Sequence, residues 1–228
     1  MQMNGQRRAL VRDESGDGRL WAAFGVMGML TVMFAVLIIY SEAPNIGPEE
    51  GKLAPNLSAP SHEAGAADWG DQFVLYDNIN RDWVEGEAGS WYLIQFIDTD
   101  CGHCWSEGEE MSIMHDQFGS YVKFITVGIS LGIPGWSTSP DEIIAFQERS
   151  DYNGCNNGNN CNTRPGEAHS WTYLNDIDGS EKSEWDVSST PFAIILQPNG
   201  VVAWNMGQHD QQEGGLPVAM NNLFGGGA

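Results

Sequence analysis

The stretch WYLIQFIDTDCGHCWSEGEEMSIMHDQF, residues 91–118, decides the fold. Its first seven residues form a nearly continuous apolar run, typical of a strand that is buried on both faces of a sheet. Cys101 and Cys104 follow almost directly. The remainder carries apolar residues at spacings that a helix can place on one side: Met111, Ile113, Met114 and Phe118. The stretch therefore predicts a buried strand, a pair of cysteines and a helix in succession.

The two cysteines have the spacing of a redox pair. A thiol in the first turn of a helix lies where unpaired backbone N–H groups and the helix dipole stabilise negative charge. We therefore expect Cys101 to ionise readily and to act as the nucleophile. Cys104 lies one turn further along, where it is placed to attack a mixed disulfide formed by Cys101.

The alternative for this pair is half of a zinc site, with Cys155 and Cys161 as the other half. Two features count against zinc. The first pair follows a buried strand directly, and the spacing of the second pair is wider than is usual in a zinc knuckle.

Sequence patterns on either side of this stretch predict a complete domain. Ser139 is an expected N-cap, with Pro140 at the first helical position and Glu142 completing a capping box. The turn 198–200 predicts a hairpin. The expected strands cover residues 73–76, 121–129, 171–174, 192–196 and 201–204, and further helices cover 181–185 and 216–224. This order predicts an α/β fold with a mixed central sheet and helices on both faces.

The strand, the tetrapeptide Cys101-Gly102-His103-Cys104, the helix and a distant Thr190-Pro191 before a hairpin resemble the thioredoxin superfamily. The resemblance implies a thioredoxin fold and a thiol–disulfide oxidoreductase that acts on protein cysteines. It also implies that Pro191 is the cis-proline against the active-site disulfide, and that the backbone of Thr190 pairs with a substrate strand. A cis bond costs little before proline, so the assignment is physically easy.

Residues 71–207 resemble, more narrowly, the membrane-tethered TlpA and ResA type. The supporting patterns are Cys-x-x-Cys-x-x-Glu, which ends in Glu107, and the segments 73–77, 174–176 and 185–187. The chain departs from thioredoxins at Gln95, where they have a buried acid. Proton transfer to and from Cys104 is therefore expected to fall to Glu107 or to water.

The direction of electron flow stays open. Cys-Gly-His-Cys is the active-site tetrapeptide of protein disulfide isomerases. We expect His103 to stabilise the Cys101 thiolate, which favours an oxidising disulfide, and we expect Asp100 to raise the pKa of Cys101 by like-charge repulsion. Oxidase or isomerase and reductase activities are both compatible with this balance. A peroxidase is disfavoured, because no Thr-x-x-Cys precedes the active-site helix.

Cys155 and Cys161 close a loop rich in Asn and Gly. We expect a structural disulfide, with a second redox relay as the alternative. The leading hypothesis without turnover is a copper chaperone that binds the metal through Cys101, Cys104 and a histidine. We predict no cofactor and no resident metal.

Residues 20–40 contain no charged side chain and span about 31 Å as a helix, enough to cross a bilayer. A cleaved signal peptide is the alternative. Four arginines precede the span, which predicts a cytoplasmic N-terminus and an extracytoplasmic domain in a single-pass cell-membrane protein. The expected organisation is a tail (1–19), an anchor (20–40), a linker rich in Pro, Gly and Ala (41–70) and a thioredoxin-like domain (71–228).

The chain of 228 residues has a formal net charge of -21. Such acidity argues against nucleic acid and anionic lipid surfaces as partners, because both would repel the protein. The expected partners are extracytoplasmic proteins with cysteines, and a transmembrane donor or acceptor of electrons.

Overall fold

A computed structural model of the chain describes residues 15–40, 45–210 and 213–225, including the side chains of 21–33 in the first segment. It contains two compact units, which divide after Pro44. The first holds one helix, α1 (Ser15–Tyr40). A search of the described residues found no helix with the length and apolar character to cross a membrane. Residues 1–14 of the predicted tail, and 41–44 of the predicted linker, lie outside the described residues.

The second unit is built on a seven-stranded mixed sheet with the order β2-β1-β7-β4-β3-β8-β9. Parallel pairing joins β3 to β4 and β4 to β7, whereas the other neighbours are antiparallel. The strands are β1 (Ser58–His62), β2 (Gln72–Val74), β3 (Trp91–Ile97), β4 (Val122–Ile129), β7 (Thr172–Asp176), β8 (Phe192–Leu196) and β9 (Val202–Asn205). The predicted hairpin is therefore confirmed as β8 and β9.

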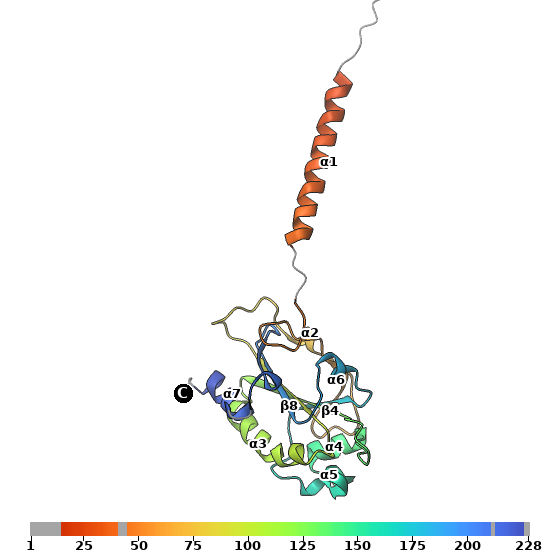
Figure 1. Ribbon diagram of the computed structural model, residues 1–228, viewed down its shortest axis with the longest axis vertical. Helices are drawn as coiled ribbons and strands as arrows, with labels where there is room; N and C mark the ends of the chain where they lie inside the picture. Colours follow the sequence, from red (N-terminus) through yellow and green to blue (C-terminus); the bar gives the residue numbers. More distant parts are fainter. Residues whose placement is uncertain (1–14, 41–44, 211–212, 226–228) are drawn as a thin grey trace, which may run out of the picture. The chain divides into compact units, whose positions relative to one another are not determined.

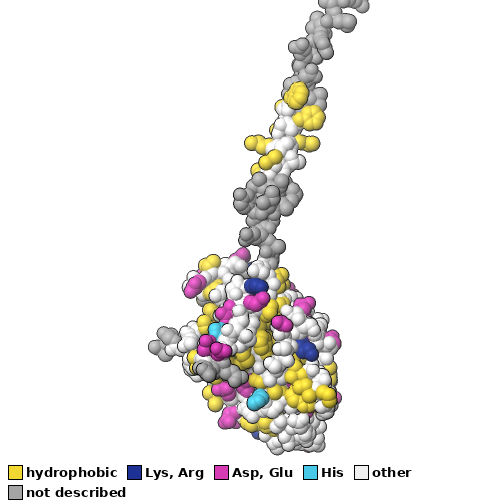
Figure 2. Space-filling model, in the orientation of Figure 1, with side chains coloured by type: hydrophobic (Ala, Val, Ile, Leu, Met, Phe, Trp, Pro, Cys, Tyr) yellow, Lys and Arg dark blue, Asp and Glu magenta, His cyan; other side chains and the backbone are white. Residues whose placement is uncertain are grey.

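Helices cover both faces of this sheet, as predicted (Figure 1). They are α2 (Leu75–Asn78), α3 (Gly102–Phe118), α4 (Pro140–Glu148), α5 (Cys155–Gly158), α6 (Ser180–Glu184) and α7 (Gly215–Phe224). Two 3-10 turns, η1 (Cys161–Thr163) and η2 (Met206–Gln208), and the short pair β5 (Asn153–Gly154) and β6 (Asn159–Asn160), complete the unit. On the face drawn in Figure 2, acidic side chains are spread over this unit and Lys and Arg are few.

The core lies in two layers, one on each side of the sheet. One layer packs α3, α4 and α7 against Leu93, Phe124 and Ile195 of the strands. The other packs Leu75 of α2 and Trp185 against the opposite face. Because β3 has a neighbour on each edge and a layer on each face, its apolar run is buried almost throughout.

Two local expectations are only partly met. Ser139 is the N-cap of α4, since its Oγ accepts the Glu142 N–H at 3.3 Å. The Glu142 carboxylate does not complete a capping box, because it accepts a hydrogen bond from the Thr99 hydroxyl instead. Ile113 was expected to share the buried side of α3, but it is 59% exposed.

The predicted linker is wrong over residues 45–70, which belong to the second unit. β1 pairs with both β2 and β7, and Leu57 is fully buried between the sheet and Leu75. The Pro-rich composition suggested a tether. However, apolar residues at wide spacing in this segment cover one face of the sheet. The strand expected over 73–76 is shorter than predicted. It ends at Val74 as β2, because α2 begins at Leu75.

Candidate active site

The two cysteines of the redox pair lie where β3 gives way to α3. Cys101 is the N-cap of α3, and Cys104 is in its first turn. Both are unbonded thiols and almost completely buried. The Cys101 Sγ lies 3.3 Å from the carbonyl oxygen of Thr190, and the Thr190-Pro191 peptide is cis. The fold thus brings together residues that are about ninety positions apart in the sequence.

The two thiols have opposite acidities. The pKa of Cys101 is lowered to about 5, chiefly because the Cys104 thiol hydrogen-bonds to it, and backbone N–H groups of Cys104 and His103 add to the effect against the opposing effect of burial. Burial raises the pKa of Cys104 well above the usual thiol range, and the hydrogen bond to Cys101 raises it further. At neutral pH, Cys101 is therefore a thiolate and Cys104 a thiol.

The lowered pKa falls on the residue that the sequence assigns as the nucleophile. His103 contributes to it through its backbone N–H, which any residue except proline would supply, and its imidazole is not among the main causes. Repulsion from Asp100 is not among the main causes that shift the pKa of Cys101, so the hydrogen bonds outweigh any such effect. The Asp100 carboxylate accepts backbone N–H groups of Ser137 at 2.7 Å and Asn157 at 3.1 Å, so it holds neighbouring loops.

Glu107 lies one turn of α3 beyond Cys104. Its Oε2 accepts a hydrogen bond from Gln95 Nε2 at 2.7 Å. Burial raises the pKa of Glu107 to about 7 against this hydrogen bond, and the charges of Glu110 and Cys101 raise it further. Gln95 takes the position at which thioredoxins have a buried acid. The site therefore still contains a carboxyl group that can exchange a proton near neutral pH.

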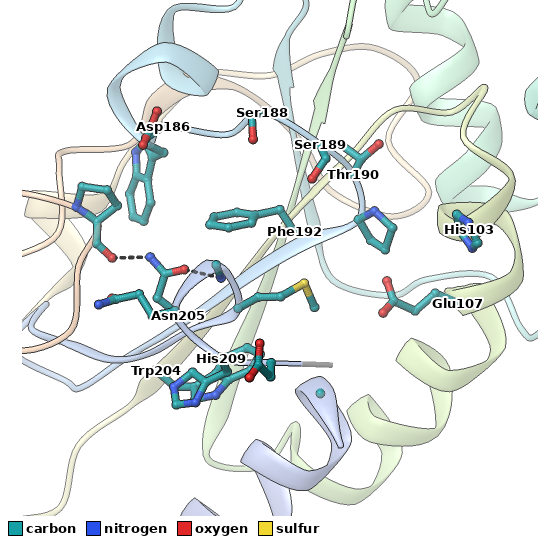
Figure 3. A pocket seen from close by; sticks show the side chains of 18 of the residues that line it. His103, Glu107, Asp186, Ser188, Ser189, Thr190, Phe192, Trp204, Asn205 and His209 are labelled. Carbon is teal, nitrogen blue, oxygen red and sulfur yellow. Dashed lines mark hydrogen bonds between the residues drawn. The ribbon is translucent and has the colours of Figure 1, made fainter. Parts of the chain in front are cut away.

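A groove of about 1000 Å³ opens beside these groups. His103 and Glu107 of α3 lie along one side, and the segment from Ser188 to Phe192 lies opposite (Figure 3). Residues of β9 and η2 close its far end. The groove reaches the cysteines at Thr190, whose carbonyl oxygen contacts the Cys101 thiol. The two cysteines do not themselves line the groove, and Thr190 is the residue that joins them to it.

Cys155 and Cys161 form the predicted disulfide, and both are fully buried. The zinc alternative is wrong in this form, because thiols bonded to each other are not available as thiolate ligands. Among the described residues, no group of three or more His, Cys, Asp or Glu side chains is placed to hold a metal ion.

The disulfide-closed loop rests on the active-site turn, which the sequence did not predict. The Asn156 N–H donates to the Thr99 carbonyl at 2.9 Å, next to the bond from Asn157 to Asp100. Both asparagines have left-handed backbones, with φ of 47° and 61°. Asparagine adopts this conformation more readily than most residues. The two adjacent asparagines were the available signal for a special turn, but nothing in them indicated where the loop would lie.

A buried polar network supports the same turn from within. Thr138 Oγ1 donates to Asp98 Oδ1 at 2.6 Å, and the Leu131 N–H donates to Asp98 Oδ2 at 2.8 Å. Thr99 donates to Glu142. Burial raises the pKa of Glu142 to about 6. The turn before Cys101 is thus fixed by a backbone N–H of the loop after β4 and by the side chains of Thr138 and Glu142.

Comparisons with known proteins give information on the fold alone. A scan against models of protein families and a search of curated proteins both find no match. Among solved structures, the mitochondrial 2-Cys peroxiredoxin from Plasmodium falciparum is 13% identical and has a TM-score of 0.50, with 77% of this chain and 94% of that chain covered.

Two disulfide oxidoreductases are also similar. The thioredoxin domain of a thiol-disulfide oxidoreductase from Bacteroides vulgatus is 13% identical over 77% of this chain and 95% of that one, with a TM-score of 0.49. A secreted Mycobacterium tuberculosis disulfide oxidoreductase homologous to E. coli DsbE is 15% identical over 74% and 96%, with a TM-score of 0.44. At these identities, structural similarity speaks only to the fold. The second unit has a mixed α/β thioredoxin-like fold.

The acidity of Cys101 can be measured directly. We expect its alkylation by iodoacetamide in the reduced protein to follow a titration with a midpoint at about pH 5. In Cys104→Ala the midpoint should rise by at least one pH unit, because the largest stabilising hydrogen bond is lost. The rate would be followed by intact mass, with Cys101→Ala as the control for labelling elsewhere. A midpoint near that of a free thiol in the unaltered protein would contradict this assignment.

Proposed function

We propose that the protein is a thiol–disulfide oxidoreductase that acts on protein cysteines through the Cys101/Cys104 couple. The observation that carries the proposal is the division of acidity between the two thiols, a thiolate at Cys101 and a thiol at Cys104. A nucleophile must be ionised to attack, and a resolving thiol is best kept protonated until it is needed. The groove beside Thr190 gives the substrate access.

In the reducing direction, the Cys101 thiolate attacks one sulfur of a substrate disulfide. The substrate S–S bond breaks, a mixed disulfide with Cys101 forms, and the departing substrate thiolate takes a proton from solvent. Cys104 then loses its proton and attacks the Cys101 sulfur. This step forms the Cys101–Cys104 disulfide and releases the second substrate thiolate, so that two electrons pass from the protein to the substrate. The oxidising direction is the reverse of these steps.

The second step requires a proton acceptor for Cys104. We assign this role to Glu107, directly or through a water molecule. Its pKa of about 7 makes it partly ionised at neutral pH, and it lies one turn of α3 beyond the resolving thiol. A base whose pKa is near the working pH is the most effective.

The segment before Pro191 supports recognition of an extended polypeptide. Within the described residues, no hydrogen bond engages the backbone N–H groups of Ser188, Ser189 or Thr190. An added strand can pair with such free backbone groups, so affinity does not depend on the substrate side chains. This property suits an enzyme whose substrates are extended polypeptides of varied sequence.

The low pKa of Cys101 favours the oxidase or isomerase direction. Stabilising the thiolate stabilises the reduced protein, and this makes the disulfide a stronger oxidant. Each pKa unit corresponds to about 1.4 kcal/mol, or about 30 mV for a two-electron couple. The reductase direction requires that an electron donor keep the couple reduced.

We also propose that the domain is extracytoplasmic and tethered to a membrane through residues 20–40. The support comes from the uncharged sequence of that stretch and the arginines before it. The Cys155–Cys161 disulfide is compatible with the oxidising conditions outside the cytoplasm.

Trapping tests the proposed function. Cys104→Ala should accumulate mixed disulfides between Cys101 and its substrates, because the resolving thiol is gone. Non-reducing gels and mass spectrometry of the captured species would show the linkage and name the substrates. The Cys101→Ala/Cys104→Ala variant is the control and should capture none. Equal capture by both variants would overturn the assignment of Cys101 as the attacking thiol.

A pH profile tests the role of Glu107. The carboxylate is present above about pH 7, so the rate at which Cys104 resolves a preformed mixed disulfide should fall as the pH drops through 7. In Glu107→Gln this inflection should disappear, and the rate at pH 8 should be at least about a hundredfold lower, as expected for loss of a general base. Stopped-flow tryptophan fluorescence would follow the step. Glu109→Gln, two residues along α3 and exposed, is the matched control and should keep the inflection.

A further inference from the structure

The charged side chains on the groove wall are mostly acidic. Glu107 and Glu110 come from α3, Asp186 follows α6, and Asp210 follows η2. Figure 3 shows Asp186 and Glu107 near opposite ends of the wall drawn there. No Lys or Arg belongs to the lining within the described part of the chain. The groove is therefore a place where negative charge gathers next to the reacting thiol.

Three of these carboxylates are uncompensated. Glu110, Asp186 and Asp210 make no side-chain hydrogen bond and no ion pair with any described residue. Other charges at the rim are paired among themselves: Lys52 lies 2.9 Å from Glu49, and His209 lies 2.6 Å from Glu50 and 2.8 Å from Glu213. A groove lined by unpaired charges of one sign favours the approach of a cation.

A second, independent feature of the wall points to a ligand. Trp185 is fully buried and lines the groove, yet its indole Nε1–H has no hydrogen-bond partner among the described residues. Leaving a buried donor unpaired is costly, so such groups usually have a partner in the working complex. Carbonyl oxygens of a polypeptide would supply one.

We propose that the groove selects polypeptide substrates that carry a lysine or arginine close to the reacting cysteine. The inference rests on the proposed function, because it names the substrate class of the same site. Glu110, Asp186 and Asp210 act as specificity-determining residues that attract the substrate cation. Trp185 and the free backbone N–H groups of Ser188 to Thr190 receive the substrate backbone.

A polypeptide fits the groove better than a small cationic disulfide. The groove has a volume of about 1000 Å³, which is at the upper end of the range for small-molecule sites. The free backbone groups of Ser188 to Thr190 offer pairing that only an extended chain can use. The carboxylates also come from separate segments along the groove, so a single small cation would leave most of them unused.

Exchange rates with matched peptides test the inference. The reduced full-length protein would be mixed with ten-residue peptides whose single cysteine carries a thionitrobenzoate group, with Lys, Gln or Glu on both sides of it. Attack by Cys101 releases coloured thionitrobenzoate, which gives the rate constant. Dividing each value by the rate with dithiothreitol removes the intrinsic reactivity of the peptide. We expect the Lys peptide to react about tenfold faster than the Glu peptide at low salt, with Gln between them.

Salt and charge-matched variants locate the effect. The ratio should shrink to less than about threefold in 1 M salt, where the Debye length is about 3 Å. It should also collapse towards one in Glu110→Gln/Asp186→Asn/Asp210→Asn. Asp68→Asn/Asp82→Asn/Glu85→Gln removes the same charge from exposed positions outside the groove and should keep the ratio.

The outcomes separate the two proposals. The Cys101→Ala variant, which lacks the attacking thiol, is the control. If no peptide reacts faster with the unaltered protein than with this variant, both the function and the inference fail. If all three peptides react at equal corrected rates, the function stands and the inference is overturned. An equal loss of the ratio in both triple variants would show an effect of net charge and overturn the role of the groove. Cystamine, a small cationic disulfide, reacting as fast as the Lys peptide would overturn the polypeptide as the preferred substrate.

Discussion

The hydrogen bond between the thiol of Cys104 and the thiolate of Cys101 is the interaction on which the site depends. It is the largest cause of the low pKa of Cys101, and it also holds the proton on Cys104. On Cys104 the hydrogen bond adds to burial, which is the larger cause of the raised pKa. Burying an ionised sulfur is unfavourable unless hydrogen bonds compensate for the lost water. The N-terminus of α3 and the Cys104 thiol provide that compensation.

The surroundings keep this geometry fixed. The turn from Asp98 to Cys101 is tied to β4 and its following loop through Asp98, to α4 through Thr99, and to the disulfide loop through Asn156 and Asn157. A catalytic pair works only if its members keep their relative positions during exchange. The Cys155–Cys161 disulfide thus has a structural part in the redox site, because it closes the loop that covers the turn.

Much of this arrangement follows from short patterns in the sequence. The apolar run of β3 and the cysteine spacing predicted the strand, the helix and the reacting pair. The resemblance to thioredoxins placed Pro191 beside them, whereas a proline before a hairpin indicates by itself only the start of a strand. In contrast, residues 45–70 looked like a tether, because their apolar residues are sparse and pack only through long-range contacts. The position of the loop at Asn156 and the effect of Asp100 also depended on tertiary contacts, which no local pattern records. The net charge of -21 first indicated only repulsion of nucleic acid and anionic lipid, whereas the structure gathers part of it at the groove.

The most direct measurement is an equilibrium redox titration of the full-length protein, with the Cys101–Cys104 disulfide quantified by mass spectrometry after acid quenching. A stabilised thiolate predicts one reversible two-electron couple with a potential less negative than about -200 mV, in the range of oxidases and isomerases. Cys155 and Cys161 should stay bonded throughout the titration. Failure of Cys101 and Cys104 to form a reversible disulfide would contradict the redox couple itself. A potential of about -270 mV, the value for thioredoxin, would contradict the stabilised thiolate as the determinant of direction.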